Sequence, residues 1–320
     1  MTEKMCSVAS LKGLIEYPEA EMNEATEDLL TAEFHDVLPG SSIKSGEENG
    51  LMILSHGKSI LNKLRAKAYF ALTSAEPKAK EGEFPFLVFN PNPYEWETEV
   101  ECEFMLADQN WSDDVISSFT VVDADGNEIP AQFIKETSHL NLDWRKRLVF
   151  KARLAPMAIS RFSVYVDFVD KKEKARDVIS GNIVFESEKT YIEISTKTGL
   201  LKSYKVNGTE YIKDEAFYLC QYDDNADPWG MGNFQLEKLG DNPQRFSLME
   251  KPDGVFAGME SVQIIENGAL RLCVEAFFKL NNSSARGDYI IHKLSGEIEV
   301  KVDLFAGEIT TMYRLAGPLA

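Results

Sequence analysis

The stretch LVFKARLAPMAISRFSVYVDF, residues 148–168, carries the clearest secondary-structure signal in the chain. Apolar side chains take every second position in both of its halves, at Leu148, Phe150, Ala152 and Leu154 and then at Phe162, Val164, Val166 and Phe168. A period of two places alternate side chains on one face of a strand. The stretch therefore predicts two successive β-strands that each turn one face to a hydrophobic core.

The surrounding sequence extends this pattern into a β-sandwich over residues 84–170. Alternation recurs at Val100, Cys102, Phe104 and Leu106, and no helical period interrupts it. The turn-forming residues DADGN, 123–127, separate the apolar segments 119–122 and 129–133. This arrangement predicts a β-hairpin between the two segments.

A second alternating series follows the charged linker DKKEKARD, residues 170–177. It predicts strands near 183–185, 191–194, 201–206, 211–212, 217–222, 261–265, 270–278, 289–292 and 298–304. We expect a larger antiparallel β-sandwich over residues 178–320. Because Ala320 follows closely on a strand-like run, we expect this unit to be truncated at its C-terminal end.

Residues 1–75 have a helical period instead. After Pro18, apolar residues recur at spacings of three and four and form one stripe at Met22, Ala25, Leu29, Leu30, Phe34 and Val37. A polar loop at 41–49 is expected before a second helix from Leu51 to Leu72, and 8–14 is the candidate for a third. The linker 74–84 closes this domain. The predicted fold class is mainly β, with a small N-terminal helical bundle followed by antiparallel β-sandwich domains.

The charge of the chain limits its partners. Its 34 basic and 52 acidic residues give a net charge of −18. Nucleic acid and anionic membrane surfaces would be repelled, whereas a neutral or cationic ligand would not. No apolar run approaches about 18 residues, so the sequence predicts no membrane-spanning helix. No pattern in the sequence indicates an oligomeric state.

The cysteines bear on the cellular compartment. Cys6, Cys102, Cys220 and Cys273 lie far apart in the sequence and form no C-x-x-C pair. They are expected to be buried thiols, which is typical of a reducing environment. Residues 1–25 also lack the basic and apolar regions of a secretory signal. We therefore expect a cytoplasmic protein.

The sharpest candidate for a functional site is EFHDVLPGSSI, residues 33–43, where His35 and Asp36 close the first predicted helix. An imidazole is a common zinc ligand, and a neighbouring carboxylate can bind metal or accept hydrogen bonds from sugar hydroxyls. The alternative is that His35 only caps the helix C-terminus, where cations are favoured. The sequence contains no H-x-D, H-x-x-H or H-E-x-x-H pattern that would complete a zinc site.

A second candidate is the loop YDDNADPWGM, residues 222–231, in which the ring of Trp229 could stack on the apolar face of a sugar. Its carboxylates do not follow the spacing of an EF-hand. The alternative is an acidic surface turn that Trp229 anchors to a sheet.

The other polar residues form no recognisable catalytic pattern. There is no G-x-S-x-G motif, no cysteine beside a His or Lys, and no carboxylate pair with an acid–base signature. The sequence therefore identifies no catalytic residue. His56, His139 and His292 are expected to be isolated surface or edge residues.

Several of these segments together resemble a known family. Tyr17-Pro18, the helix after it and FHDVLPGSSI resemble the central helical domain of the α-mannosidases of glycoside hydrolase family 38. The segments FLVFNPNPYEWETEVE, VVDADGNEIPAQ, RLVFKARL and GLLKSY resemble the sandwich strands that follow that domain. DNADPWGM and YIIHKLSGEIEV resemble a bacterial branch, so the likeness covers most of the chain from about residue 10.

The resemblance implies a zinc-dependent retaining exo-glycosidase that acts on α-mannosides. In the family, zinc is held in an N-terminal α/β barrel by a His-x-Asp pair and a further Asp, which is also the nucleophile, and by the His of the His-Asp motif. His35 matches that last zinc ligand, and Asp36 matches the adjacent carboxylate that contacts substrate hydroxyls. The barrel and its ligands have no counterpart in this chain.

The resemblance leads to the expectation that the chain is part of such an enzyme, inactive and without its own zinc until the missing barrel supplies the rest of the site. A retaining glycosidase needs two carboxylates about 5–5.5 Å apart, and no such pair is identified. The alternative is a non-catalytic β-sandwich protein with a carbohydrate-binding or structural role. An unrelated interaction module is a third possibility, which a buried His35 would favour.

Overall fold

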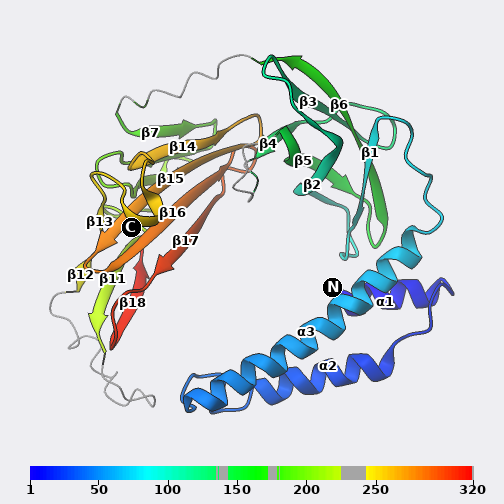
Figure 1. Cartoon of the computed structure of the whole chain (residues 1–320), viewed down its shortest axis with the longest axis horizontal. Helices are drawn as coiled ribbons and strands as arrows, with labels where there is room; N and C mark the ends of the chain where they lie inside the picture. The colour runs from blue at the N-terminus through cyan, green and yellow to red at the C-terminus, as the bar shows by residue number, and fades with distance from the viewer. Residues whose placement is uncertain (135, 137–142, 172–178, 180, 225–242, 319–320) are drawn as a thin grey trace.

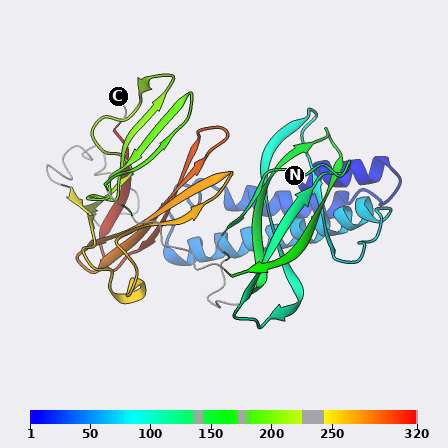
Figure 2. The ribbon, with the colours of Figure 1, turned by 90° about the horizontal axis from the view of Figure 1, so that it is seen from above.

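The fold is mainly β with an N-terminal helical segment, as predicted. A computed structural model describes residues 1–134, 136, 143–171, 179, 181–224 and 243–318. In Figure 1 the helices lie along one side of two separate groups of antiparallel strands, and Figure 2 shows the same two groups side by side when the molecule is seen from above. No helix of the described residues is long and apolar enough to cross a membrane.

The helical segment consists of α1 (Thr2–Leu11), α2 (Glu19–Ala32) and α3 (Lys44–Thr73). The predicted polar loop at 41–49 is wrong, because α3 already begins at Lys44 and its first two turns expose their polar side chains. Two glycines let α3 approach its neighbours. A Cβ at Gly57 would lie 3.1 Å from Asp28 Cβ, and one at Gly50 would lie 2.6 Å from Val37 Cγ1.

The first β unit is a two-sheet sandwich. Its strands are β1 (Glu83–Phe89), β2 (Trp96–Asn110), β3 (Val115–Val122), β4 (Ala131–Ile134), β5 (Asp143–Leu154) and β6 (Ile159–Asp170). The sheets have the strand orders β1-β6-β3 and β2-β5-β4. The stretch 148–168 supplies one strand to each sheet, and most of its alternating residues, among them Phe150 and Phe162, meet in the core between them. The predicted core position of Phe168 is wrong, because the end of β6 extends beyond this core and Phe168 is exposed.

The predicted hairpin at 119–133 is only partly correct. The turn forms, because Asp123 Oδ1 accepts hydrogen bonds from the backbone N–H groups of Asp125 and Asn127. The strands on either side then separate: β3 pairs with β6 and β4 pairs with β5, and only a bridge between Val122 and Glu128 joins them. The chain crosses to the opposite sheet at Pro130, whose carbonyl accepts a hydrogen bond from the backbone N–H of Lys151 on β5.

A buried carboxylate lies where β1 begins. Glu83 accepts hydrogen bonds from the backbone N–H of Lys80 at 2.7 Å, from the Ser163 hydroxyl at 2.6 Å and from the Arg161 guanidinium at 2.6 Å. These bonds stabilise the charged form and lower the pKa of Glu83 to about 2. Glu83 therefore ties β1 to β6 as a carboxylate.

This contact predicts a specific acid sensitivity. Because the pKa of Glu83 is lower in the folded chain, its stabilisation is present above the ordinary value of 4.5 and is lost as the pH falls toward about 2. We expect Glu83→Gln to lose less stability than the wild type between about pH 6 and about pH 3 in urea unfolding. The exposed Glu95→Gln is the control and should keep the wild-type acid dependence. An unchanged acid dependence in Glu83→Gln would contradict the assignment.

The second β unit contains three antiparallel sheets. One, of order β10-β9-β8-β7, is built from β7 (Ile183–Glu186), β8 (Thr190–Ile194), β9 (Leu201–Val206) and β10 (Thr209–Glu210). The largest has the order β13-β15-β16-β17 with β14 also on β15, and contains β13 (Ser247–Leu248), β14 (Val262–Asn267), β15 (Arg271–Leu280), β16 (Ser283–His292) and β17 (Ile298–Phe305). These two sheets share a core that includes Ile192, Leu201, Val274 and Tyr289.

The third sheet has the order β12-β11-β18, with β11 (Tyr218–Asp223), β12 (Gln244–Arg245) and β18 (Thr311–Ala316), while the short helix η2 (Gly254–Phe256) precedes β14. The last segment, LFAGEITTMYRLAGPLA, has only a loose likeness to the sandwich strands of the family that the chain resembles, yet its strand β18 pairs with β11 along its whole length. The Tyr313 ring packs near Phe246, and its hydroxyl donates to Glu308, which fixes the strand.

Candidate functional site

The predicted metal ligand and its neighbour lie in the connection between α2 and α3. Helix α2 ends at Ala32, earlier than the sequence suggested, and His35 and Asp36 follow in a series of turns that ends at Gly40. Their side chains are 77% and 39% exposed, and His35 Nε2 lies 3.5 Å from Asp36 Oδ2. Figure 1 shows this connection at the end of the helical pair that lies farthest from the first β unit.

The donor set at this turn is incomplete for zinc. A protein zinc site needs about three protein ligands even when it leaves a position open for water. In the described part of the chain, no group of three or more His, Cys, Asp or Glu side chains is arranged to hold a metal ion. His35 can offer one imidazole nitrogen and Asp36 one carboxylate, so these residues do not fit a zinc ion by themselves.

Exposed apolar side chains surround the turn. The Phe34 ring lies 4.2 Å from the His35 ring between centroids, and Phe34, Leu38 and Ile43 are all exposed. The apolar stripe on α2 predicted that this face of the helix packs against other residues. The prediction is confirmed at Ala25, which is buried, and is wrong at Leu30, which is exposed. The described chain therefore offers no cover for much of this stripe, and we call the group Leu30, Phe34, Leu38 and Ile43 the tip patch.

The second sequence candidate cannot be placed. Of the candidate loop 222–231, residues 225–231, which include Trp229, lie outside the described residues. The loop follows β11, whose last residue is Asp223, and Asp224 donates its backbone N–H to Thr310. The role of Trp229 therefore stays a prediction.

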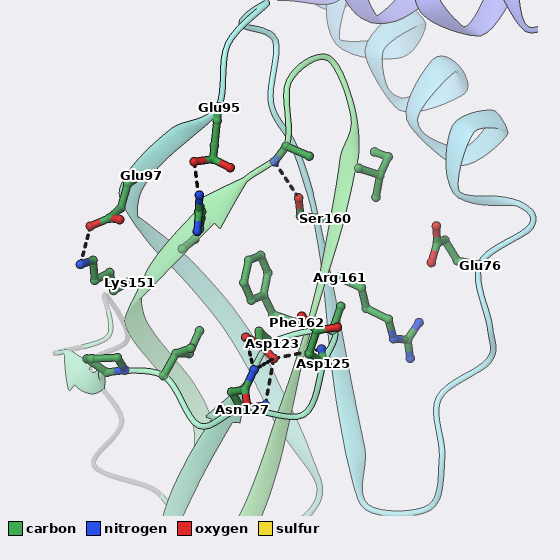
Figure 3. A pocket seen from close by; sticks show the side chains of 17 residues that line it. Glu76, Glu95, Glu97, Asp123, Asp125, Asn127, Lys151, Ser160, Arg161 and Phe162 are labelled. Atoms are coloured by element: carbon green, nitrogen blue, oxygen red, sulfur yellow. Dashed lines mark hydrogen bonds and ion pairs between the residues drawn. The ribbon is translucent and has the colours of Figure 1, made fainter.

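The structure shows a hollow of about 740 Å³ at one end of the first β unit, which the sequence did not indicate. Strands β2, β5 and β6, the 123–127 turn and the segment after α3 contribute to its wall. Figure 3 shows Glu95 and Glu97 on one side and Glu76 on the other, with Asp123 and Asn127 below. The volume is in the range of small-molecule sites.

Several polar groups of this hollow are engaged with one another. Lys151 pairs with Glu97, and Arg153 Nε lies 2.7 Å from Glu95 (Figure 3). The backbone N–H of Asn127 and its side-chain amide lower the pKa of Asp123, whose carboxylate closes the turn. Phe162 is buried in the core and presents no open ring for stacking on a sugar. The hollow has room for a ligand.

This hollow forms where strands distant in sequence converge, so spacing alone could not reveal it. The one local signal was the turn motif DADGN, which marks a part of its wall. The structure does not bring the hollow together with His35 and Asp36: no residue of the α2–α3 turn lines it.

Two of the histidines expected to be isolated have partners. His56 Nδ1 lies 2.7 Å from Asp28 Oδ2, on the surface between α2 and α3. His292 Nδ1 lies 2.8 Å from Glu99 Oε2, although the two residues belong to different β units. His139 lies outside the described residues.

Comparison with known proteins adds no family to these observations. No family model matches the chain, and no curated protein matches it either.

Proposed function

We propose that this chain is the central helical and β-sandwich part of a zinc-dependent retaining α-mannosidase that removes terminal α-mannosides. In this proposal His35 supplies one zinc ligand, Asp36 contacts substrate hydroxyls, and a barrel domain supplies the remaining ligands and the carboxylates. The observation that carries it is the exposed His35–Asp36 pair within a tip of exposed apolar residues.

An exposed apolar tip of this kind is suited to binding another domain. Contiguous exposed apolar residues on a surface mark interaction sites, and here they flank a ligand pair that lacks the rest of its donors. Docking of a second domain on the tip patch would cover Phe34, Leu38 and Ile43 and bring new ligands to His35. A buried His35 would have favoured an unrelated interaction module. His35 is exposed, so that alternative gains no support.

We place the protein in the cytoplasm in this proposal. All four cysteines are free thiols, and Cys6, Cys220 and Cys273 are buried. Burial raises the pKa of the Cys102 thiol to about 12, so it is unreactive as well.

The first test measures the activity of the chain by itself. We expect the purified 320-residue chain to release no product from an aryl α-mannoside, with or without added zinc, because one imidazole and one carboxylate cannot hold a catalytic metal. Zinc-dependent hydrolysis that is lost in His35→Ala would contradict the proposal.

A second experiment tests whether His35 contributes to the metal site of the assembled enzyme. Co-expression with a polypeptide encoded directly upstream that carries a barrel and a His-x-Asp pair should give mannosidase activity. His35→Ala should abolish that activity, whereas His56→Ala, at another exposed helical histidine, should not. Equal activity in both variants would rule out a role for His35 in the metal site.

The second candidate function is a non-catalytic carbohydrate-binding module, favoured by the hollow of about 740 Å³ in the first β unit. Calorimetric titration with mannose and mannobiose separates the two functions. Saturable binding would support the module, whereas our proposal expects no binding to the isolated chain. Arg153→Ala tests binding in the hollow, and Trp229→Ala tests the stacking role predicted for the 222–231 loop.

A further inference from the structure

The two β units meet through a buried polar contact that does not involve the His35 site. Gln132 on β4 accepts hydrogen bonds at its Oε1 from the backbone N–H groups of Leu270 at 2.8 Å and Arg271 at 2.7 Å. Its Nε2 donates to the Arg271 carbonyl. A Cβ at Gly268 would collide with the Gln132 side chain, so only glycine allows this approach. Figure 1 shows β4 beside the ends of β14 and β15.

An apolar cluster and an ion-pair network support this contact. Leu270 packs against Ile134 and Val149 of the first β unit, and all three are buried. The Arg271 guanidinium contacts Glu101 on β2 and Glu266 on β14, so one cation joins the two units. The contact is thus built from backbone bonds, apolar packing and charge together.

His292 lies at the edge of the same contact, directly opposite Arg271 in the β15–β16 ladder. Its Nδ1 lies 2.8 Å from Glu99 Oε2 on β2, and the two side chains are 22% and 15% exposed. Its Nε2 lies 3.9 Å from Glu299 on β17.

These neighbours have opposite effects on the charge of His292. The carboxylates of Glu99 and Glu299 favour a protonated imidazole, whereas Arg271 on β15 disfavours it. On β5, Lys151 stands opposite Glu99 in the register but pairs with Glu97. The hydrogen bond to Glu99 is the strongest of these effects and raises the pKa of His292.

We propose that this contact is a pH-sensitive clamp between the two β units, in which a protonated His292 bridges to Glu99 and holds β16 against β2. Loss of the proton removes the ion pair but leaves the Gln132 and Arg271 contacts in place. The two units therefore remain attached, but transient separation of β16 from β2, which breaks the Gln132 bonds, becomes more frequent. This inference is independent of the proposed mannosidase function.

The direction of the effect follows from linkage. A histidine whose pKa is raised on folding contributes its full stabilisation below its ordinary pKa of 6.5 and loses it as the pH rises through the raised value. The clamp is therefore closed in mildly acidic solution and looser in alkaline solution.

The test follows the backbone amides of Leu270 and Arg271 by hydrogen exchange, because their bonds to Gln132 break when the clamp opens. After correction for intrinsic exchange, we expect protection of these amides to be several-fold lower at about pH 8 than at about pH 6. His292→Gln should remove this difference. His56→Gln is the matched control, because the His56–Asp28 pair lies within the helical segment, and it should keep the wild-type response.

A second variant keeps the test decisive if His292→Gln does not fold. Glu99→Gln removes the charged partner of His292 and should also abolish the pH response. A wild-type chain with pH-independent protection at these amides would overturn the proposal. So would a folded His292→Gln or Glu99→Gln variant that keeps the full response.

Discussion

Replacing Arg271 by methionine should lower the free energy of unfolding by about 3–5 kcal/mol. The guanidinium is 5% exposed and is shared by Glu266, which is also buried, and Glu101. Burial alone would raise the pKa of Glu101, but the hydrogen bond and charge of Arg271 lower it. Without the cation, the Glu266 carboxylate, whose side chain is only 8% exposed, would have no neutralising partner among the described residues. Urea unfolding at about neutral pH measures the loss.

The matched control is Arg153→Met, which breaks an arginine–glutamate pair with Glu95 on the surface. Its side chain is 73% exposed, so the loss should stay within about 0.5 kcal/mol. Adding Glu266→Gln to Arg271→Met should recover part of the stability, because the buried charge then disappears. Similar losses in Arg271→Met and Arg153→Met would contradict the assigned role of the buried network.

The second large effect is expected in the core of the first β unit. Phe150→Ala should lower the free energy of unfolding by about 3–5 kcal/mol, because it leaves a cavity where the described side chains are closely packed. Phe150 is fully buried on β5, and its ring lies 4.9 Å between centroids from Phe162 on β6, in the opposite sheet. The same unfolding experiment measures the change.

Phe168→Ala provides the comparison for Phe150, because it removes the same side chain from the exposed end of β6, where Phe168 is 55% exposed. Its cost should be below about 1 kcal/mol. A cost at Phe168 equal to that at Phe150 would mean that the core lies elsewhere than between β5 and β6.

The strands were predictable because their signal is local. At Phe150 and Phe162 the period of two alone indicates which face is buried, whatever the partner strand is. The hairpin at 119–133 was only half right because the choice of partner strand is not local. Pro130 ends the short bridge, and β3 and β4 complete their ladders in different sheets.

The His35–Asp36 and Glu99–His292 pairs also differ in how far a local sequence pattern could predict them. His35 and Asp36 are adjacent in sequence, so their proximity was foreseeable, but the predicted helix that they were to close ends at Ala32, and both lie exposed on the turn after it. Their roles in zinc and substrate binding stay predictions. By contrast, Glu99 and His292 are 193 residues apart, and neither residue alone signals the other.

The sequence by itself indicated the helical first part, most of the strands and which of their faces are apolar, because these depend on the period of side chains along one segment. It misplaced α1, which spans Thr2–Leu11 rather than 8–14, and it predicted a strand at 211–212 that does not form. Only the tertiary structure decided that the α2 stripe stays partly uncovered, that β3 and β4 belong to different sheets, and that Arg271 and His292 join the two β units. These outcomes depend on which surfaces meet. That is settled by burial and charge pairing summed over distant residues rather than by any local pattern.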